Sequence, residues 1–400
     1  MSNRGTATAL TGANRAAGNF SGNTARNNQG ASGGSVAFNA GAAINKSNGS
    51  AMITTGAAGA LGNQTSTTDA DVTNRGSAAA TTGGNRAVGN SSGNTADNRQ
   101  SASAARIATN AATSLNTSNG AAAITTGPAS ALGNDAVSNG GGTVINRGIA
   151  VATTGNNSAI GNASSNTASN SQRAIGSFAT NLANAENQSN GTASIETGAA
   201  VATGNRAVTT VSQEDEGADE PWVQIGQDVV VINRGSAVAV TGANQAIGNR
   251  SVNDAETIQR ALGFRLAVNS GNTVSHSDGS ASILTGSATA VGNAATTTVE
   301  QAAEVDPVKN PLALVDQTIT IRNIGDATAI SGRNAGTGNG SVNFGLNRQL
   351  ASAVAAVHSS TGSSQNNSDG AVDITSGDAT AVGNTAASTA TQRLISRAAA

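Results

Sequence analysis

The sequence predicts an all-β protein, a parallel β-solenoid, and three observations support this fold class. A frame of glycines and asparagine, G-x6-G-x5-G-N, occurs ten times along the 400 residues. Most copies follow one another at about 44 residues, a period typical of solenoids and repeat arrays. Between the first two glycines of each copy, residues alternate as they do in a strand with one buried face.

The ten copies belong to two strictly alternating subfamilies, which makes five tandem double units. Members of the first subfamily have Asn before the first glycine, in four cases as Asn-Arg-Gly, and members of the second begin with Ser-Asn-Gly or Ser-Asp-Gly. The repeats run from Gly5 to Asn384 without a visible interior boundary. We therefore predict that residues 1–400 form a single continuous repeat domain.

The predicted buried face is lined by small residues and isoleucine. The second position after the first glycine is Ala in nine copies and Val372 in the tenth. Two residues further, the first subfamily has Ala and the second has Ile, so we expect small and large side chains to interlock along a narrow interior. The isoleucines assigned to the core are Ile53, Ile124, Ile195, Ile283 and Ile374.

The glycines and the asparagine of the frame each have an expected structural role. Glycine at a corner supplies a positive φ angle or lets two backbones approach closely. The asparagine is expected to stack on its equivalents in an amide ladder, donating to one neighbour and accepting from the other. The ladder residues are Asn19, Asn63, Asn90, Asn134, Asn162, Asn205, Asn249, Asn293, Asn339 and Asn384.

The segments between the frames are harder to assign. More apolar stretches follow the first subfamily's frame at 35–44, 104–115, 173–185, 260–269 and 350–360. Both strand and short helix are open for them, and we expect strand for the first and fourth only. At about 4.8 Å per stacked rung, ten units would span on the order of 50 Å with one turn each, or 140 Å with three.

Two insertions, at 212–228 and 300–317, interrupt the repeat. Loops that project from a solenoid commonly carry partner contacts, so the first insertion is a candidate partner loop. Its residues are Glu214, Asp215, Glu216 and Trp222. With Asp219 and Glu220 its carboxylates could also bind a cation weakly, but a solvated acidic loop is the favoured interpretation. A pair of hydrolase carboxylates would need a fixed spacing, which nothing here defines.

Composition argues against an enzyme and against nucleic acid as a partner. Glycine contributes 50 residues, aromatic residues 2% and charged residues 11%, unlike an enzyme with a bulky core. A net charge of −2, no Tyr and one Trp provide neither a basic patch nor a stacking platform. The only histidines, His276 and His358, lie near Ser and Asp but at different offsets, which favours surface histidines over a catalytic triad. We predict no catalytic residue, no cofactor and no metal site.

No stretch of about 18 apolar residues is present, so we expect no membrane span. The chain has no cysteine and hence no disulfide or thiolate metal site. The opening residues, MSNRGTATAL, do not read as a signal peptide, so export would need a signal outside this segment or another route.

Three phrases resemble the head repeats of trimeric autotransporter adhesins, in which x-A-x-G-N-x-S motifs form a parallel β-roll. They are NRAVGNSSGNTA (85–96), NSAIGNASSNTA (157–168) and NQAIGNRSVNDA (244–255). The likeness covers about twelve residues of a double unit, and those heads repeat at a shorter period. The resemblance implies a bacterial, surface-exposed β-solenoid.

The expected function is structural and non-enzymatic: a self-assembling protein of an extracellular filament, sheath or surface layer, with itself as partner. The alternative is an adhesin or carbohydrate-binding solenoid, with surface glycans as partner. A polysaccharide-active enzyme ranks third, because the sequence lacks aromatic residues on which sugars would stack and a pair of carboxylates at a fixed spacing. The Thr-Thr-Gly triplets at 54–56 and 125–127 leave an ice-binding surface as a weaker alternative.

Overall fold

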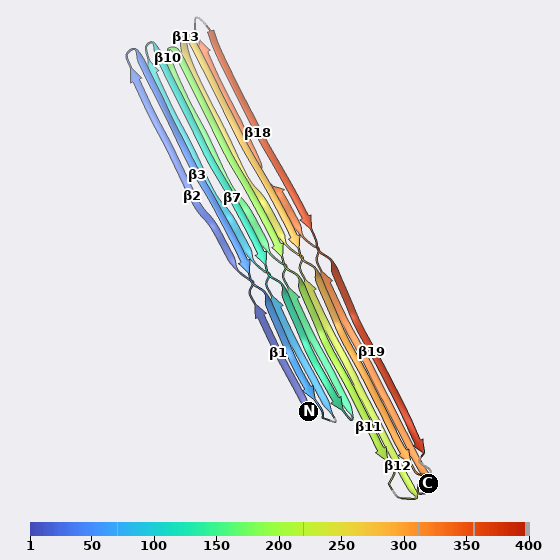
Figure 1. Ribbon diagram of the computed structural model, residues 1–400. Coiled ribbons are helices and arrows are strands. Elements are labelled where there is room, and N and C mark those ends of the chain that lie inside the picture. The colour runs from blue at the N-terminus through green and yellow to red at the C-terminus, as the bar shows by residue number, and fades with distance from the viewer. Residues whose placement is uncertain (70, 219, 311, 355–356, 397–400) are drawn as a thin grey trace.

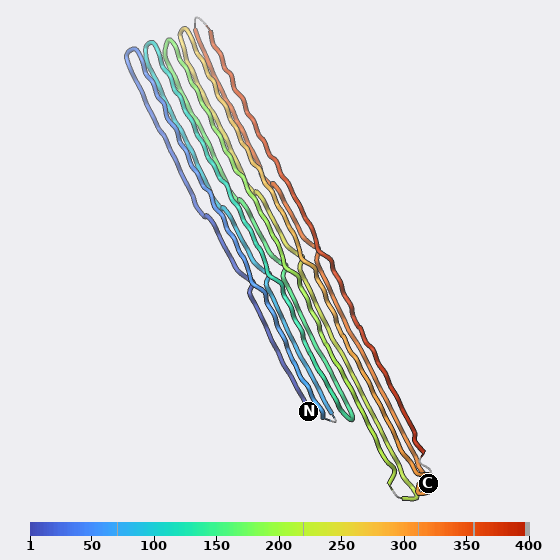
Figure 2. Tube along the Cα trace, viewed as in Figure 1, coloured from blue at the N-terminus to red at the C-terminus, as the bar shows by residue number. Residues whose placement is uncertain are grey.

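The computed structural model describes residues 1–69, 71–218, 220–310, 312–354 and 357–396, and the regular structure in these ranges is β-strand throughout. The chain winds through five coils that lie side by side in a long, flat body (Figure 1). Each coil runs along one side, turns at the far end and returns along the other, as Figure 2 shows. Neighbouring coils pair in parallel, so the prediction of a parallel β-solenoid is confirmed.

Sheet A contains the first leg of every coil. Its strands are β1 (Ser2–Leu10), β5 (Val72–Thr81), β9 (Thr143–Thr153), β12 (Trp222–Val240) and β15 (Leu312–Ile330).

Sheet B contains the middle of every coil, including the far turn. Its outgoing strands are β2 (Arg15–Gly33), β6 (Arg86–Ala104), β16 (Ala335–Asn339) and β17 (Val342–Ala353). Its returning strands are β3 (Val36–Thr55), β7 (Ile107–Thr126) and β18 (Val357–Thr375). In the third and fourth coils both legs belong to one long element, β10 (Ser158–Thr197) and β13 (Gln245–Thr285).

Sheet C contains the last leg of every coil and lies against sheet A. Its strands are β4 (Ala58–Thr67), β8 (Ala129–Gly140), β11 (Ala200–Glu216), β14 (Ala288–Val305) and β19 (Ala379–Ser396).

One coil corresponds to one double unit, so each frame of the repeat occupies only half a coil. Equivalent asparagines in successive coils are 71, 72, 87 and 90 residues apart. The expectation of one or three turns per 44-residue unit is therefore wrong. Five coils stack to only about 25 Å, whereas one side of a coil, such as β1 followed by β2, extends on the order of 100 Å. The body is elongated along its strands rather than along the stacking direction.

The two sides of each coil cross near the middle of the body (Figure 2). At this crossing the residue after the middle glycine of the first frame has a positive φ of 60–75°. These residues are Ala13, Gly84, Asn156, Ala243 and Arg333. The left-handed corner thus comes one residue after the frame glycine, so of the two roles expected for the frame glycines the positive φ angle is not the one observed.

The frame glycines instead let the two sides touch backbone to backbone, the other role expected for them. A Cβ added to the first glycine of the first frame would overlap a carbonyl oxygen of the last glycine of the second frame, on the facing sheet. The facing pairs are Gly5 and Gly62, Gly76 and Gly133, Gly148 and Gly204, Gly235 and Gly292, and Gly325 and Gly383. The interior is therefore too thin at these columns for any side chain.

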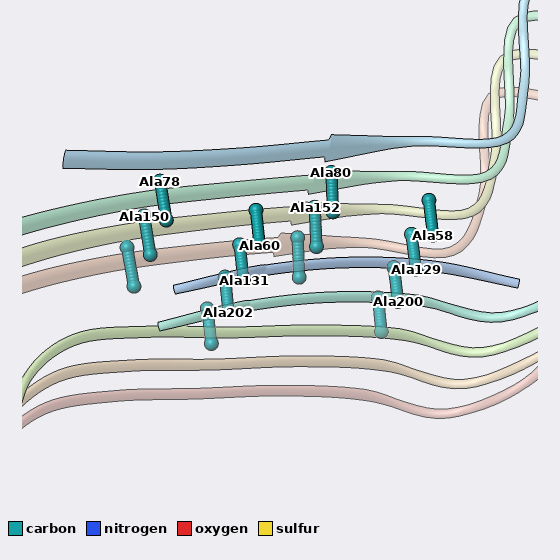
Figure 3. Packing of buried hydrophobic residues seen from close by; sticks show 14 residues of the cluster. Ala58, Ala60, Ala78, Ala80, Ala129, Ala131, Ala150, Ala152, Ala200 and Ala202 are labelled. Carbon is teal, nitrogen blue, oxygen red and sulfur yellow. The ribbon is translucent and has the colours of Figure 1, made fainter. Parts of the chain in front are cut away.

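Alanine fills one part of the space between sheets A and C, and a separate cluster of valines, among them Val144, Val211 and Val231, fills another. Figure 3 shows Ala78 and Ala80 of one leg and Ala58 and Ala60 of the facing leg, with their equivalents in later coils stacked behind them. In sheet B the isoleucines of the second subfamily pack against Ala87, Ala159 and Ala246 of the first. Small and large residues therefore meet across the interior, while each column along the stack keeps one residue type.

The predicted core isoleucines fall into two groups. Ile53, Ile124, Ile195 and Ile283 are buried. Ile374 occupies the same column in the last coil, where β18 pairs only with β13, and 41% of its surface is exposed.

All five apolar segments after the first frame form strands around the far turn, so the expectation of strand for only two of them is wrong. The parallel register with the neighbouring coil imposes extended backbone on all of them. Inward-facing alanines, among them Ala37, Ala108, Ala179 and Ala267, stack there into a core of their own. Residues 355–356 of the last segment lie outside the described part of the chain.

The two insertions mainly lengthen the sheets. Ser212–Glu216 pairs with Glu300–Glu304, and Trp222–Asp228 pairs with Leu312–Thr318. Because both insertions occur at the same point of successive coils, each provides the other with a parallel neighbour. The expected projecting loops reduce to short turns, within which Asp219 and Pro311 lie outside the described residues.

Ile283→Asp tests the buried face. The side chain is 1% exposed, and an uncompensated charge there is expected to lower the free energy of unfolding by at least about 3 kcal/mol or to prevent folding. Leu284→Asp, the adjacent residue on the outer face and 46% exposed, is expected to stay within about 0.5 kcal/mol of wild type. Equal losses in urea denaturation would contradict the assigned faces.

Gly235→Ala tests the backbone contact between the sheets. Its new Cβ would overlap Gly292, so we expect a loss of about 1–3 kcal/mol or more in the free energy of unfolding. Gly226→Ala, in the same strand β12 with open space at its Cβ, should be neutral or stabilising by about 0.5–1 kcal/mol. Thermal denaturation of the two variants makes the comparison, and a tolerated Gly235→Ala would refute the proposed contact.

Candidate functional site

The asparagines that end each frame form two separate ladders, one for each subfamily. In the first, Nδ2 of each residue donates to Oδ1 of its equivalent in the next coil, at 2.7, 2.8, 2.9 and 3.1 Å. The members are Asn19, Asn90, Asn162, Asn249 and Asn339. The second ladder, with bonds of 2.7–2.8 Å, contains Asn63, Asn134, Asn205, Asn293 and Asn384. Each partner lies one coil away, not in the next copy along the chain.

The local sequence explains why these amides point inward. Each follows the glycine at which the two sheets touch, and the next inward position on the strand is a small residue. Around Asn90 the hydroxyls of Ser92 and Ser118 each accept a hydrogen bond from Nδ2 at 3.0 Å. A buried amide needs partners for both donors and its acceptor, and the ladder with its flanking serines supplies them.

Further amide columns line the interior, and the sequence analysis did not identify them. One consists of the asparagines of the Asn-Arg-Gly motif and its variant: Asn3, Asn74, Asn146, Asn233 and Asn323. A second lies at the crossing: Asn14, Asn85, Asn157, Asn244 and Asn334. A glutamine column lies near the far turn: Gln29, Gln100, Gln172, Gln259 and Gln349. The signal for each is a constant offset within the double unit: the column at the crossing lies inside the first-subfamily frame, two residues after its middle glycine, and the other two lie outside the frame.

The asparagine and glutamine columns run in opposite directions. In the asparagine ladders Nδ2 donates toward the last coil, whereas Nε2 of Gln172 donates to Gln100 in the preceding coil. Backbone carbonyls fix these orientations, because they only accept. Nε2 of Gln172 also donates to the carbonyl of Leu182, and Nδ2 of Asn249 to that of Ser189.

The two ends of the stack are consequently complementary. In the first coil β1, β2, β3 and β4 each pair on one side only, and so do β15 to β19 in the last coil, as far as the described residues go. Asn384 accepts from Asn293, and its Nδ2 has no hydrogen-bond partner in the part of the chain that the structure describes. Asn63, the first member of the same ladder, donates onward and leaves Oδ1 facing the opposite end.

The candidate partner loop does not form one surface. Glu214 and Glu216 lie on one face of β11, while Asp215 lies on the other, where Oδ2 accepts a hydrogen bond of 2.9 Å from Gln227. Trp222 opens β12 and is 60% exposed. Among the described residues no group of three or more potential ligands is placed to hold a metal ion.

The side chains of His276, Ser277 and Asp278 are not arranged as a catalytic triad. Nε2 of His276 lies 2.8 Å from Oδ2 of Asp278, but Ser277 between them points inward. Its hydroxyl bonds with that of Ser341 and accepts from Asn343 at 2.9 Å. The serine is therefore on the opposite side of the strand from the imidazole. His358, on the last returning strand, is exposed.

The Thr-Thr-Gly triplets divide between the two faces. Thr55 and Thr126 point inward, and their hydroxyls donate to carbonyls at the crossing. Thr54 and Thr125 point outward, but Glu196 and Leu284 continue their column in the next coils. The outer surface is therefore no regular threonine array at this position.

No family model and no curated protein matches this chain. The likeness to adhesin head repeats accordingly rests on the three phrases alone. In the structure they lie in β6, β10 and β13, where each contributes its Gly-Asn pair to the first ladder. Within the described ranges no helix is long and apolar enough to cross a bilayer.

Asn162→Ala tests the ladder. Asn162 lies in the middle of its ladder, so its removal orphans the buried Oδ1 of Asn249. Nδ2 of Asn90 also loses an acceptor, but two serine hydroxyls remain as acceptors for its two N–H groups. We expect the free energy of unfolding to fall by about 1–3 kcal/mol, the cost of one buried orphan. Asn19→Ala, at the end of the same ladder and partly exposed, should cost about half as much in urea denaturation. Identical losses would show that the ladder bonds add nothing beyond burial of the residue.

Proposed function

We propose that this protein is a structural, non-enzymatic subunit that stacks end to end, last coil on first coil, into an extracellular filament, sheath or surface layer. The observation that supports it is the complementarity of the two end coils. Each presents a row of parallel strands with unpaired backbone groups, which is a template for pairing with another chain. The asparagine ladders run through all five coils, so both ends carry the same amide residues in the same register.

Side-chain hydrogen bonding favours the same arrangement. A copy placed beyond the last coil would bring Oδ1 of its Asn63 opposite Nδ2 of Asn384 and so continue the ladder without a change in direction. The glutamine column, which donates the other way, would be continued equally by Gln29 of the new copy meeting Gln349. Stacks of identical amides between chains are a recognised source of stability in cross-β assemblies.

Burial of apolar surface also favours stacking. Ile374 is 41% exposed, while Ile283 in the same column one coil earlier is 1% exposed. A further coil would place Ile53 and Ala16 over Ile374 and remove it from water, which is favourable.

The two ends of the stack match except where the insertions have lengthened the strands of sheets A and C. β15 and β19 have 19 and 18 residues, whereas β1 and β4 have 9 and 10. The lengthened legs extend beyond the first coil at the end that carries both termini (Figure 1). They would remain unpaired at each junction. The amide columns would set the register of the junction, since only one alignment superimposes them. Placement outside the cell is part of the proposal and rests on the resemblance to adhesin heads.

Ile374→Lys tests assembly separately from folding. The lysine would block an incoming coil, but its position at the open end should leave the melting temperature of the single chain nearly unchanged. Electron microscopy should show filaments for wild type and none for this variant. Thr375→Lys, the neighbouring residue on the outer face, should assemble as wild type does. Wild-type protein that stays monomeric or forms closed trimers at every concentration and salt would refute the proposal.

A further inference from the structure

A column of arginines lies on the outer face of sheet A. Arg4, Arg75, Arg147 and Arg234 are in register on β1, β5, β9 and β12, one in each of four successive coils. All four are exposed and point away from the interior, because the neighbouring asparagine and glycine of the motif point inward. Adjacent strands lie about 4.8 Å apart, so the backbones of neighbouring arginines in the column have the same separation. A net charge of −2 for the whole chain conceals this local row of positive charge.

None of these four arginines makes an ion pair or side-chain hydrogen bond within the described residues, whereas Arg99 and Arg206 each pair with an aspartate. Arg206 donates through Nε to Asp135 at 2.8 Å, and this bond raises the pKa of Arg206. Like charges directly opposite one another on neighbouring strands destabilise a sheet. The sheet nevertheless repeats the arginine four times, and a bound chain of negative charges would offset that repulsion.

The column borders a hollow of about 430 Å³ on the surface of sheet A. Its floor is the backbone of the glycine column of Gly5, Gly76, Gly148 and Gly235, whose Cβ direction is toward the interior. Its other wall carries the hydroxyls of Thr6, Ser77 and Ser236, with Ile149 between them. The only carboxylate among its described lining residues is Asp326, in the last coil, where Ile324 takes the arginine's position.

The equivalent surface over the second subfamily has a different chemistry. There the residue before the glycine is asparagine in three coils and Asp278 or Asp369 in the others. Shallow hollows over this column are lined by these residues and by small ones. A row of four arginines is therefore particular to the column on sheet A and does not follow from the coil geometry.

We propose that the arginine column binds an acidic polysaccharide, a linear chain of uronate sugars that lies across the coils. The planar guanidinium group matches a carboxylate with two parallel hydrogen bonds. One arginine per strand spacing suits a polymer with one carboxylate per sugar, since a pyranose unit is close to a strand spacing in length. The threonine and serine hydroxyls opposite suit the hydroxyls of the sugar. The described lining contains no aromatic side chain on which nucleic-acid bases would stack.

The site is complete within one chain, so it does not depend on stacking of subunits. The experiment compares the full-length wild-type chain with Arg75→Gln/Arg147→Gln, which removes the two central charges. Binding to fluorescent oligogalacturonate is measured by anisotropy at low and at physiological salt, with neutral dextran as the uncharged comparison. Arg173→Gln/Arg260→Gln is the matched control: both are exposed arginines in register on neighbouring strands of sheet B, and the change in charge is the same.

We expect the wild type to bind oligogalacturonate and not dextran, with affinity that falls as salt rises. The column variant should bind at least about tenfold more weakly, through loss of charge-assisted hydrogen bonds, and the control should bind within about twofold of wild type. If circular dichroism shows that the column variant is misfolded, Arg75→Lys/Arg147→Lys replaces it. This variant keeps the charge but loses the planar fork, and should bind several-fold more weakly.

Three results would overturn the proposal. The wild type could fail to bind oligogalacturonate, or the column and control variants could lose affinity for it equally. The column could also bind oligodeoxythymidylate or polyphosphate more tightly than oligogalacturonate. Electron microscopy of the column variant separates this site from assembly. The variant should still form any filaments that the wild type forms, because the arginines face away from the coil edges.

Discussion

The contact between glycine backbones on facing sheets is the constraint on which the rest of the structure depends. Because Gly148 and Gly204 leave no room between the sheets, the flanking interior positions admit only small side chains or flat amides. A large hydrophobic core cannot form in so thin a body. Near the glycine contacts the interior between sheets A and C therefore consists of alanine columns, and larger residues lie farther from these contacts, as valine between sheets A and C and as isoleucine in sheet B.

An interior of this kind must satisfy its polar groups along the stack. Asn162 and Asn205 are fully buried, and each finds its ladder partners only in the same position of the coils before and after it. An amide ladder requires the same residue in every coil, so the repetition of the sequence is a requirement of hydrogen bonding as much as of backbone geometry. Outward positions carry no such requirement, and Thr54 and Glu196 can share one column.

Much of the fold could be predicted because each column of stacked residues corresponds to a fixed position in the sequence repeat. Alternation identified the strand faces, and the frame identified Asn90 and Asn134 as ladder residues. The spacing of copies could not reveal which copies are neighbours, so the expected turn, of one 44-residue unit or a third of it, is shorter than the observed coil of 71–90 residues. Ala239 and Ile283 occupy the same frame position in the two subfamilies, and one column with alternating alanine and isoleucine would pack poorly. This difference indicates that each copy stacks on copies of its own subfamily. The positive φ of Ala13 and Asn156 had no signal, because neither position is consistently glycine.

The opposed directions of the asparagine and glutamine columns bear on how far such a stack can grow. Aligned amide groups add their dipoles, as peptide groups do along a helix. A stack with all its ladders pointing one way would gain charge separation between its ends with every coil. Here the glutamine column of Gln172 and Gln259 points against the asparagine columns and cancels part of that sum. Each added coil thus contributes less polarisation than its number of amides implies, which eases growth in the stacking direction.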